Sequence, residues 1–173
     1  MGESVNLINN FKIDNVIFNC GSYNNLEKNL IKVLKFKNVK YVSCINELNI
    51  DDYKFKFLNT KEYDKENDSS SVIYTELGNY KFLFMADAGV EKERYILDKY
   101  NLSNIDVLKV GHHGSKISSS TNFISSINPK YSLISVGENN RYGHQNKEVI
   151  NNLANTKIYR TDRDGSIMLK IIN

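Results

Sequence analysis

The residue types best suited to metal or acid–base chemistry are confined to three short stretches of this sequence. Two of the three histidines, His112 and His113, stand in "VGHHGSK", the third, His144, ends "ENNRYGH", and Asp87 stands in "MADAG". Imidazole and carboxylate are ligands for zinc, manganese or iron, and imidazole also transfers protons. Taken singly, Asp87 would as readily cap a helix near residue 90, and each histidine would be a hydrogen-bonded loop residue. Taken together, the four residues predict a metal site.

Donors suited to a phosphate group stand next to these histidines. They are Ser115 with Lys116 after the histidine pair, and Arg141 with Tyr142 before His144. Hydroxyl groups, backbone amides and a basic side chain ahead of a helix form a cradle for an anion. "GSK" is a common tripeptide, so the pattern favours a phosphodiester ligand without specifying one.

Each of the three stretches follows a segment that reads as a β-strand, namely "YKFLF", "IDVLKV" and "YSLISV". The carboxyl ends of strands in an open α/β sheet are where ligands gather. Hydrophobic periodicity predicts helices over 5–11, 26–34, from 90 onward, 119–127 and 146–154. It predicts strands over 15–19, 40–45, 53–59, 71–77, 80–86, 105–111, 131–137, 157–161 and 166–172, with a loop over 61–70, a hairpin turn at 78–79 and a turn at 162–165. The expected class is α/β (α+β), one domain over residues 1–173, with helices covering a mixed sheet or a pair of sheets.

Composition narrows the function very little. The chain has 173 residues, 40% of them hydrophobic, and a formal net charge of +3, which tolerates an anionic partner but does not choose one. We expect Cys20 and Cys44 to be two buried thiols, in preference to a disulfide or a zinc site, because they form no CxxC pair. No secretory signal or run of about 20 apolar residues is present, so the location is unassigned and cytoplasmic by default.

One long segment resembles a known family. "DVLKVGHHGSKISSSTNFISSINPKYSLISVGENNRYGH" is similar to the C-terminal half of the metallo-β-lactamase-fold hydrolase domain of the ComEC type, found in bacterial DNA-uptake proteins. "YTELGNYKFLFMADAG" and "KIYRTDRDGSIMLKI" fit the strand pair and the closing hairpin of that domain. The resemblance implies an αββα sandwich, a site for two divalent ions (zinc or manganese), and hydrolysis of nucleic acid, with DNA ahead of RNA.

The sequence departs from that family in small ways and in one large way. Ala86 stands where the family usually has glycine, and Gln145 where it usually has proline; we expect these to stiffen one turn and to remove another. The superfamily motif His-x-(His or Asp)-x-Asp-His is absent, since His112 is the first histidine. We therefore expect a domain that is incomplete at its N-terminus, with an exposed sheet that promotes self-association.

The resemblance implies a role for each candidate residue. Asp87, His113 and His144 would be metal ligands, and His112 or His113 would transfer a proton. Ser115, Lys116, Arg141 and Tyr142 would hold phosphate. With the main motif missing, we expect a half-built site that binds metal weakly and is inactive alone. Whether the chain is an enzyme stays open: the alternatives are a metal-free nucleic-acid or phosphate-binding module and a pseudo-enzyme fragment. As part of a ComEC-type membrane protein it would be extracytoplasmic.

Overall fold

A small lobe of two helices and two strands forms the first part of the chain. The computed structural model describes residues 3–58, 61–63 and 66–171. In the small lobe, helices α1 (Ser4–Asn10) and α2 (Asn25–Phe36) alternate with strands β1 (Asn15–Phe18) and β2 (Lys40–Ser43), which pair in parallel. A capping box between Asn24 and Glu27 starts α2. The lobe has its own hydrophobic cluster, built on Ile8, Phe18, Leu30, Ile31 and Leu34.

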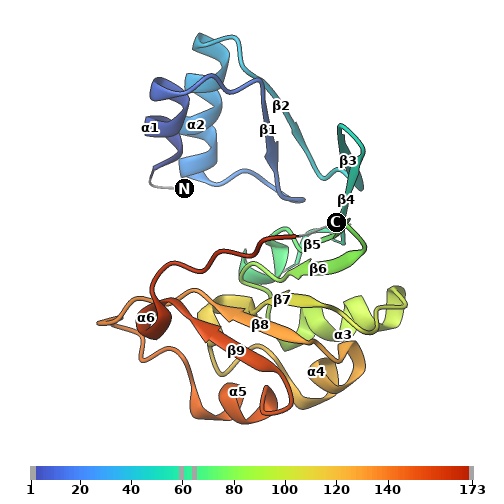
Figure 1. Cartoon of the computed structure of the whole chain (residues 1–173). Helices are drawn as coiled ribbons and strands as arrows, with labels where there is room; N and C mark the ends of the chain where they lie inside the picture. Colours follow the sequence, from blue (N-terminus) through green and yellow to red (C-terminus); the bar gives the residue numbers. More distant parts are fainter. Residues whose placement is uncertain (1–2, 59–60, 64–65, 172–173) are drawn as a thin grey trace.

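A seven-stranded mixed sheet forms the rest of the fold, with strands in the order β3-β4-β5-β6-β7-β8-β9 (Figure 1). The antiparallel part comprises β3 (Glu47–Ile50), β4 (Tyr53–Phe57), β5 (Ile73–Leu77) and β6 (Tyr80–Phe84). The parallel part continues from β6 through β7 (Val107–Lys109), β8 (Tyr131–Ile134) and β9 (Lys157–Arg160). Helices α3 (Val90–Lys99), α4 (Thr121–Ile127) and α5 (Lys147–Asn152) connect these parallel strands. The expected mixed α/β class is confirmed.

The main hydrophobic core lies between this sheet and its three helices. Leu83, Leu108 and Ile134 point from neighbouring strands into the same cluster as Phe123 and Ile127 of α4. All five side chains are almost fully buried. Burial of apolar surface in this cluster therefore contributes most of the hydrophobic stabilisation. The core fixes the parallel strands and therefore the loops at their carboxyl ends.

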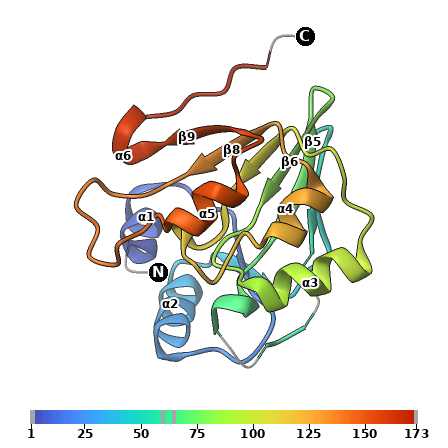
Figure 2. The ribbon, with the colours of Figure 1, turned by 90° about the horizontal axis from the view of Figure 1, so that it is seen from below.

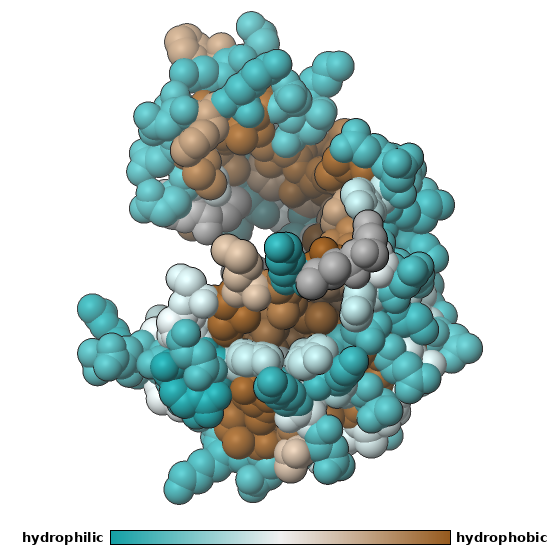
Figure 3. All heavy atoms as spheres, viewed as in Figure 1, coloured by the Kyte–Doolittle hydropathy of each residue, from teal (hydrophilic) through white to brown (hydrophobic). Residues whose placement is uncertain are grey.

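The other face of the large sheet is also apolar, but less completely covered. Phe82, Val107, Tyr131 and Tyr159 from four adjacent strands line a hollow of about 240 Å³ on this face together with residues of the C-terminal segment. The small lobe lies over this side, and an open hollow with hydrophobic lining separates it from the sheet (Figure 3). Phe84, stacked on Phe82, remains 38% exposed. We call this surface the outer face.

Most elements expected from periodicity are present, and the misses have local causes. The hairpin at 78–79 is confirmed by β5 and β6, whereas β3 was not foreseen because 47–50 has too few apolar residues to stand out. Residues 161–164 form the short helix α6 (Thr161–Asp164) in place of the expected turn. The strand expected over 166–172 is wrong for 166–171, which form no strand; Leu169, Lys170 and Ile171 lie on the outer face instead of pairing with β9. Ile172 lies outside the described residues.

The expectation of two unpaired thiols is wrong, because Cys20 and Cys44 form a disulfide. The in-register pairing of β1 with β2 places Phe18 opposite Ser43, and each cysteine follows shortly after its strand. Their Cα atoms are 4.2 Å apart, which puts the two sulfur atoms in bonding range. The pairing thus follows from strand register, which cysteine spacing does not reveal.

No helix within residues 3–58, 61–63 and 66–171 combines the length and the apolar character that crossing a membrane requires.

Candidate metal and phosphate site

The three chemistry-bearing loops meet at one edge of the large sheet. They follow β6, β7 and β8, and these strands run parallel, so their carboxyl ends lie side by side. The loop after β8 is the longest of the three and projects from this edge before α5 begins (Figure 2). The structure thereby brings Asp87, His112, His113 and His144 into one neighbourhood, as the strand-end pattern predicts.

The Asp87 loop is held by the segment 66–70. The Ser70 hydroxyl accepts a hydrogen bond from the Asp87 backbone amide (3.1 Å), and the buried Asp68 carboxylate accepts one from Gly89 N (2.7 Å). Gly89, not Asp87, is the N-cap of α3, so the capping alternative for Asp87 is not realised. Ala86 has φ +48°, a left-handed conformation that costs an L-residue about 1 kcal/mol and that glycine adopts freely. Ala86 therefore strains this turn, and the stiffening expected from the sequence stays a prediction.

His113 is oriented toward Asp87 by a backbone carbonyl. Its Nδ1 donates a hydrogen bond to the oxygen of Ser135 (2.6 Å), which leaves Nε2 3.9 Å from Asp87 Oδ1. Both His112 and His113 adopt left-handed backbone conformations, with φ +45° and +54°. Such strain in consecutive non-glycine residues is typical of functional sites. A histidine whose Nδ1 is fixed by a carbonyl is the usual arrangement for metal ligation through Nε2.

His112 lies between the Asp87 loop and His144. Its backbone amide donates to Ala86 O (2.8 Å), and its ring meets the ring of His144 edge-on at a centroid distance of 5.7 Å. The Nδ1 of His112 is buried and has no hydrogen-bond partner among the described residues. Burial lowers the pKa of His144, and His112 and His113 lower it further. The site thus favours neutral imidazole at His144, the form that binds metal.

Lys109 is a charged neighbour that the sequence did not single out. It ends β7, and its ammonium donates to Val110 O (3.2 Å). Burial lowers the pKa of Lys109, while the nearby Asp87 carboxylate acts in the opposite direction. The amine thus provides positive charge beside the candidate ligand without forming a close ion pair.

Gln145 joins the His144 loop to β9. With its amide oxygen facing Arg160, Gln145 accepts hydrogen bonds from the guanidinium, with Nη1 at 2.9 Å. Asn146 N donates to Gly114 O (2.9 Å), which ties the same loop to the histidine pair. The expectation that Gln145 merely removes a turn is therefore incomplete, because this residue makes a specific contact.

The four expected phosphate donors differ in accessibility. Ser115 is buried, and its backbone amide and carbonyl are used within the 112–118 turn. Lys116 and Arg141 are exposed, and Tyr142 is 81% exposed. The turn after Ser115 does not lead directly into a helix, since α4 begins only at Thr121. The anion cradle expected ahead of this helix stays a prediction, with Lys116 and Arg141 as its exposed cations.

The donor set fits part of a metal site. No group of three or more His, Cys, Asp or Glu side chains suited to a metal ion occurs in the part of the chain that the structure describes. Asp87 and His113 do fit as two ligands, because Oδ1 and Nε2 face each other while Nδ1 is already anchored. A stable catalytic ion normally takes three protein ligands. Whether this pair is half of a metal site, as expected from the sequence, stays a prediction.

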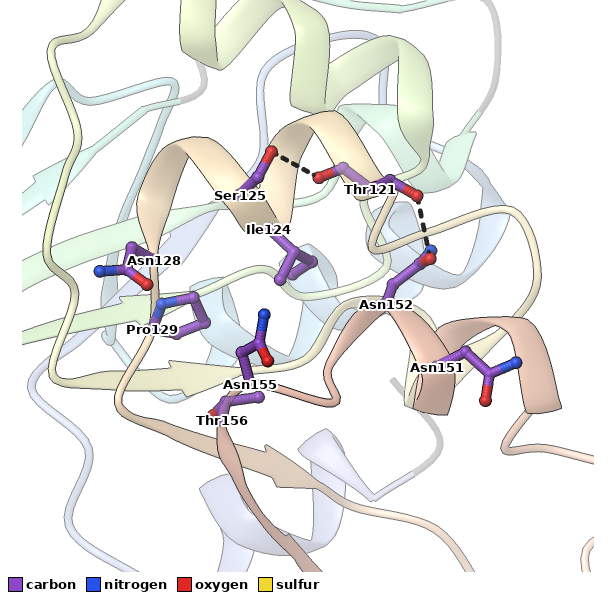
Figure 4. Close-up of a pocket in the computed structure, with 9 residues that line it drawn as sticks. All are labelled: Thr121, Ile124, Ser125, Asn128, Pro129, Asn151, Asn152, Asn155 and Thr156. Atoms are coloured by element: carbon purple, nitrogen blue, oxygen red, sulfur yellow. Dashed lines mark hydrogen bonds between the residues drawn. The ribbon is translucent and has the colours of Figure 1, made fainter.

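A second hollow lies at the opposite edge of the sheet, between α4 and α5 (Figure 4). It has a volume of about 230 Å³ and is lined by Thr121, Ile124, Ser125, Asn128, Pro129, Asn151, Asn152, Asn155 and Thr156. Thr121 donates to the Asn152 side chain there (2.9 Å). None of the lining side chains is charged or titratable, so this hollow offers neither an acid–base group nor a strong metal ligand.

Comparison with known proteins connects the chain to bacterial competence. It is 36% identical to the ComE operon protein 3 of Bacillus subtilis over 130 residues, which cover 73% of this chain and 17% of that protein. It is 33% identical to the competence protein ComA of Neisseria gonorrhoeae over 123 residues, covering 68% of this chain and 18% of that protein. The chain carries a ComEC-type domain.

Other comparisons give the context of this ComEC-type domain. Recombination protein 2 of Haemophilus influenzae is 35% identical over 92 residues, which cover 53% of this chain and 11% of that protein. The chain thus spans less than a fifth of each of these three relatives. A putative zinc-dependent hydrolase of the metallo-β-lactamase superfamily from Thermotoga maritima overlaps 84% of this chain and 70% of its own, with a TM-score of 0.41 and 14% identity. No family model matches the chain.

Several residues that shape the site of this ComEC-type domain escaped sequence reasoning. Lys109 and Arg160 end strands β7 and β9 and contribute an amine and a guanidinium. Ser135 follows β8 and contributes its backbone carbonyl. The lysine alone left a signal, since a charged residue in the otherwise apolar "IDVLKV" stands out. The carbonyl of Ser135 left none, because any residue at that position supplies one.

Proposed function

We propose that Asp87 and His113 contribute ligands to a divalent-cation site of a ComEC-type phosphodiester hydrolase that acts on nucleic acid, DNA ahead of RNA. The observation that carries this proposal is the arrangement of His113, whose Nδ1 is fixed by Ser135 while Nε2 faces Asp87. Zinc and manganese both accept this pair of donors. Two ligands hold an ion weakly, so the chain by itself is inactive.

Bound at this pair, a divalent ion supplies Lewis acidity and charge stabilisation for phosphoryl chemistry. The other side chains assist in separate ways. His112 or His113 can exchange a proton with a leaving oxygen, and His144 completes the imidazole cluster as a third candidate ligand. Lys116 and Arg141 are exposed cations suited to the phosphates of the strand. The sandwich domain of which this chain forms part acts within a longer protein and outside the cytosol.

The second candidate function is a metal-independent module that binds nucleic acid. The observation in its favour is that the described residues include no group of three metal-binding side chains. In that case Lys116 and Arg141 hold the phosphate backbone, and Asp87 repels it. Binding would then be indifferent to chelators and would tighten when Asp87 loses its charge.

Metal titration separates the two functions. Calorimetry with Mn²⁺ should give weak, saturable binding to the chain, which Asp87→Asn and His113→Asn each reduce by at least about tenfold, the usual effect of losing an interaction that tunes a metal site. Asp98→Asn is the matched control, since Asp98 is an exposed carboxylate on α3. Equal Mn²⁺ binding by all three variants would rule out the Asp87–His113 pair as a ligand set.

A further inference from the structure

Tyr142 is the outermost of three aromatic rings in contact, a row that starts inside the candidate site. The rings of His112 and His144 meet edge-on with their centroids 5.7 Å apart. The ring of Tyr142 stacks on that of His144, with a centroid distance of 5.7 Å and an interplanar angle of 19°. Tyr142 is nevertheless 81% exposed, so His144 covers only a small part of the ring. A large aromatic ring that is held flat and left in water is a surface on which another planar group can stack.

The ring is displayed on a supported loop. Asn140 makes reciprocal bonds with His144: the His144 amide donates to Asn140 Oδ1 (2.8 Å), and Asn140 Nδ2 donates to His144 O (2.5 Å). Asn140 also bonds to Gly137 O through its backbone and side-chain nitrogens (3.3 and 3.2 Å). These contacts fix His144, and His144 in turn supports one side of Tyr142. Preorganisation of this kind lowers the entropic cost of binding.

The surroundings suit a polyanion that carries flat rings. Arg141 immediately precedes Tyr142 and is exposed, and Lys116 is exposed on the loop after β7. Single-stranded nucleic acid combines these two chemistries, because proteins bind it with basic groups on phosphates and aromatic side chains on bases. A duplex exposes the faces of its bases only at its two ends, so such a ring favours unpaired bases.

We propose that Tyr142 is a stacking platform for an unpaired nucleobase of a single strand whose backbone runs past Arg141 and Lys116 toward Asp87 and His113. This inference rests on the proposed function and assigns Tyr142 a role different from phosphate binding. Stacking on Tyr142 would make single-stranded nucleic acid the preferred substrate. It would not distinguish sequences, because every unpaired base has a free face.

The absence of tryptophan makes the test direct. In Tyr142→Trp the only indole reports on this position, and its emission should be quenched by oligothymidylate but not by an abasic oligomer of equal length. In the presence of a chelator, which excludes metal-mediated binding, Tyr142→Ala should bind oligothymidylate roughly tenfold more weakly than the parent chain. This loss is within the range for one stacked base. Tyr142→Phe should restore affinity, and Tyr53→Ala, at another exposed tyrosine on β4, should have no effect.

The outcomes separate this inference from the proposed function. Salt-dependent binding of oligothymidylate with no effect of Tyr142→Ala, or an equal loss on the abasic oligomer, overturns the stacking role and leaves the proposed function standing. No binding of either oligomer overturns both the stacking role and nucleic acid as the substrate. Preference for a long duplex over the single strand also overturns the stacking role, because a duplex presents a free base face only at its two ends.

Discussion

His113 Nε2 lies 3.9 Å from Asp87 Oδ1, and the opposite ring nitrogen of the same histidine donates to Ser135 O at 2.6 Å. The carbonyl holds the ring so that Nε2 faces the carboxylate. A ring nitrogen and a carboxylate oxygen in this arrangement can both bind one divalent cation. This relationship makes the pair the centre of the candidate site.

Activity should require more ligands than this pair. We expect negligible manganese- or zinc-dependent cleavage of single-stranded DNA by the chain alone, because two ligands hold an ion too weakly for turnover. Joining a segment that carries the His-x-(His or Asp)-x-Asp-His motif should restore cleavage, and Asp87→Ala should then abolish it. Lys116→Ala should mainly weaken binding and reduce the salt slope by about one. Robust cleavage by the chain alone would contradict the ligand count.

The contact between the histidine-pair loop and the His144 loop can be measured with two glycines. Gly114 and Gly143 both have positive φ (+78° and +63°), so alanine is strained at either position. Only at Gly114 would the new Cβ meet another loop, 2.8 Å from the Cβ of Gln145. Urea denaturation should show a loss of about 1 kcal/mol for Gly143→Ala and about 2–3 kcal/mol for Gly114→Ala. Equal losses would mean that the two loops are not in close contact.

Lys92 should make stability depend on pH in the alkaline range. This lysine of α3 is fully buried, with its ammonium 4.3 Å from the centre of the Tyr63 ring, and burial lowers its pKa to about 8. An unfolded lysine titrates near 10.4, so between these values the unfolded chain binds more protons and the free energy of unfolding rises with pH. We expect a rise of about 1–2 kcal/mol from pH 8 to about 9.5, below the range in which unfolded tyrosines ionise.

Denaturation of matched variants checks the assignment to Lys92. Lys92→Met should remove the rise, because methionine has no proton to lose. Lys37→Met, at an exposed lysine after α2, should preserve it. A rise that persists in Lys92→Met would have to come from another group.

The outer face should promote self-association with a second copy of the chain. Phe84 is 38% exposed and stacks on Phe82, which lines the mainly apolar and aromatic hollow on this face. Exposed apolar surface of this kind associates in water. Sedimentation at increasing concentration should show dimers that Phe84→Lys disrupts, whereas Phe36→Lys, at the 84% exposed residue ending α2, should leave them intact. A monomer at all concentrations would contradict this expectation.

The position of the four candidate residues could be predicted from the sequence, because each lies in a stretch that follows a segment with the local pattern of a strand. The loops after β6, β7 and β8 could be placed at one edge from the sequence alone, and Asp87, His112, His113 and His144 do lie there. The hydrogen bond from His113 to Ser135 could not be predicted from the sequence, because it joins a side chain to a backbone carbonyl 22 residues away. The segment after Gly165 is rich in β-forming apolar residues, but such a run does not say whether the edge of a sheet accepts it.

The bond between Cys20 and Cys44 has a practical consequence for handling the molecule. It closes a sequence separation of 24 residues across the ends of β1 and β2, and a cross-link over a loop of that length contributes about 3 kcal/mol. Thiol-reducing cytosol removes such bonds, whereas periplasm and culture medium preserve them. In protein expressed in a reducing host, we therefore expect the small lobe to be less stable, while the large sheet is unaffected. Measurements on the small lobe should accordingly begin with a free-thiol assay, and an oxidising expression host is the appropriate source.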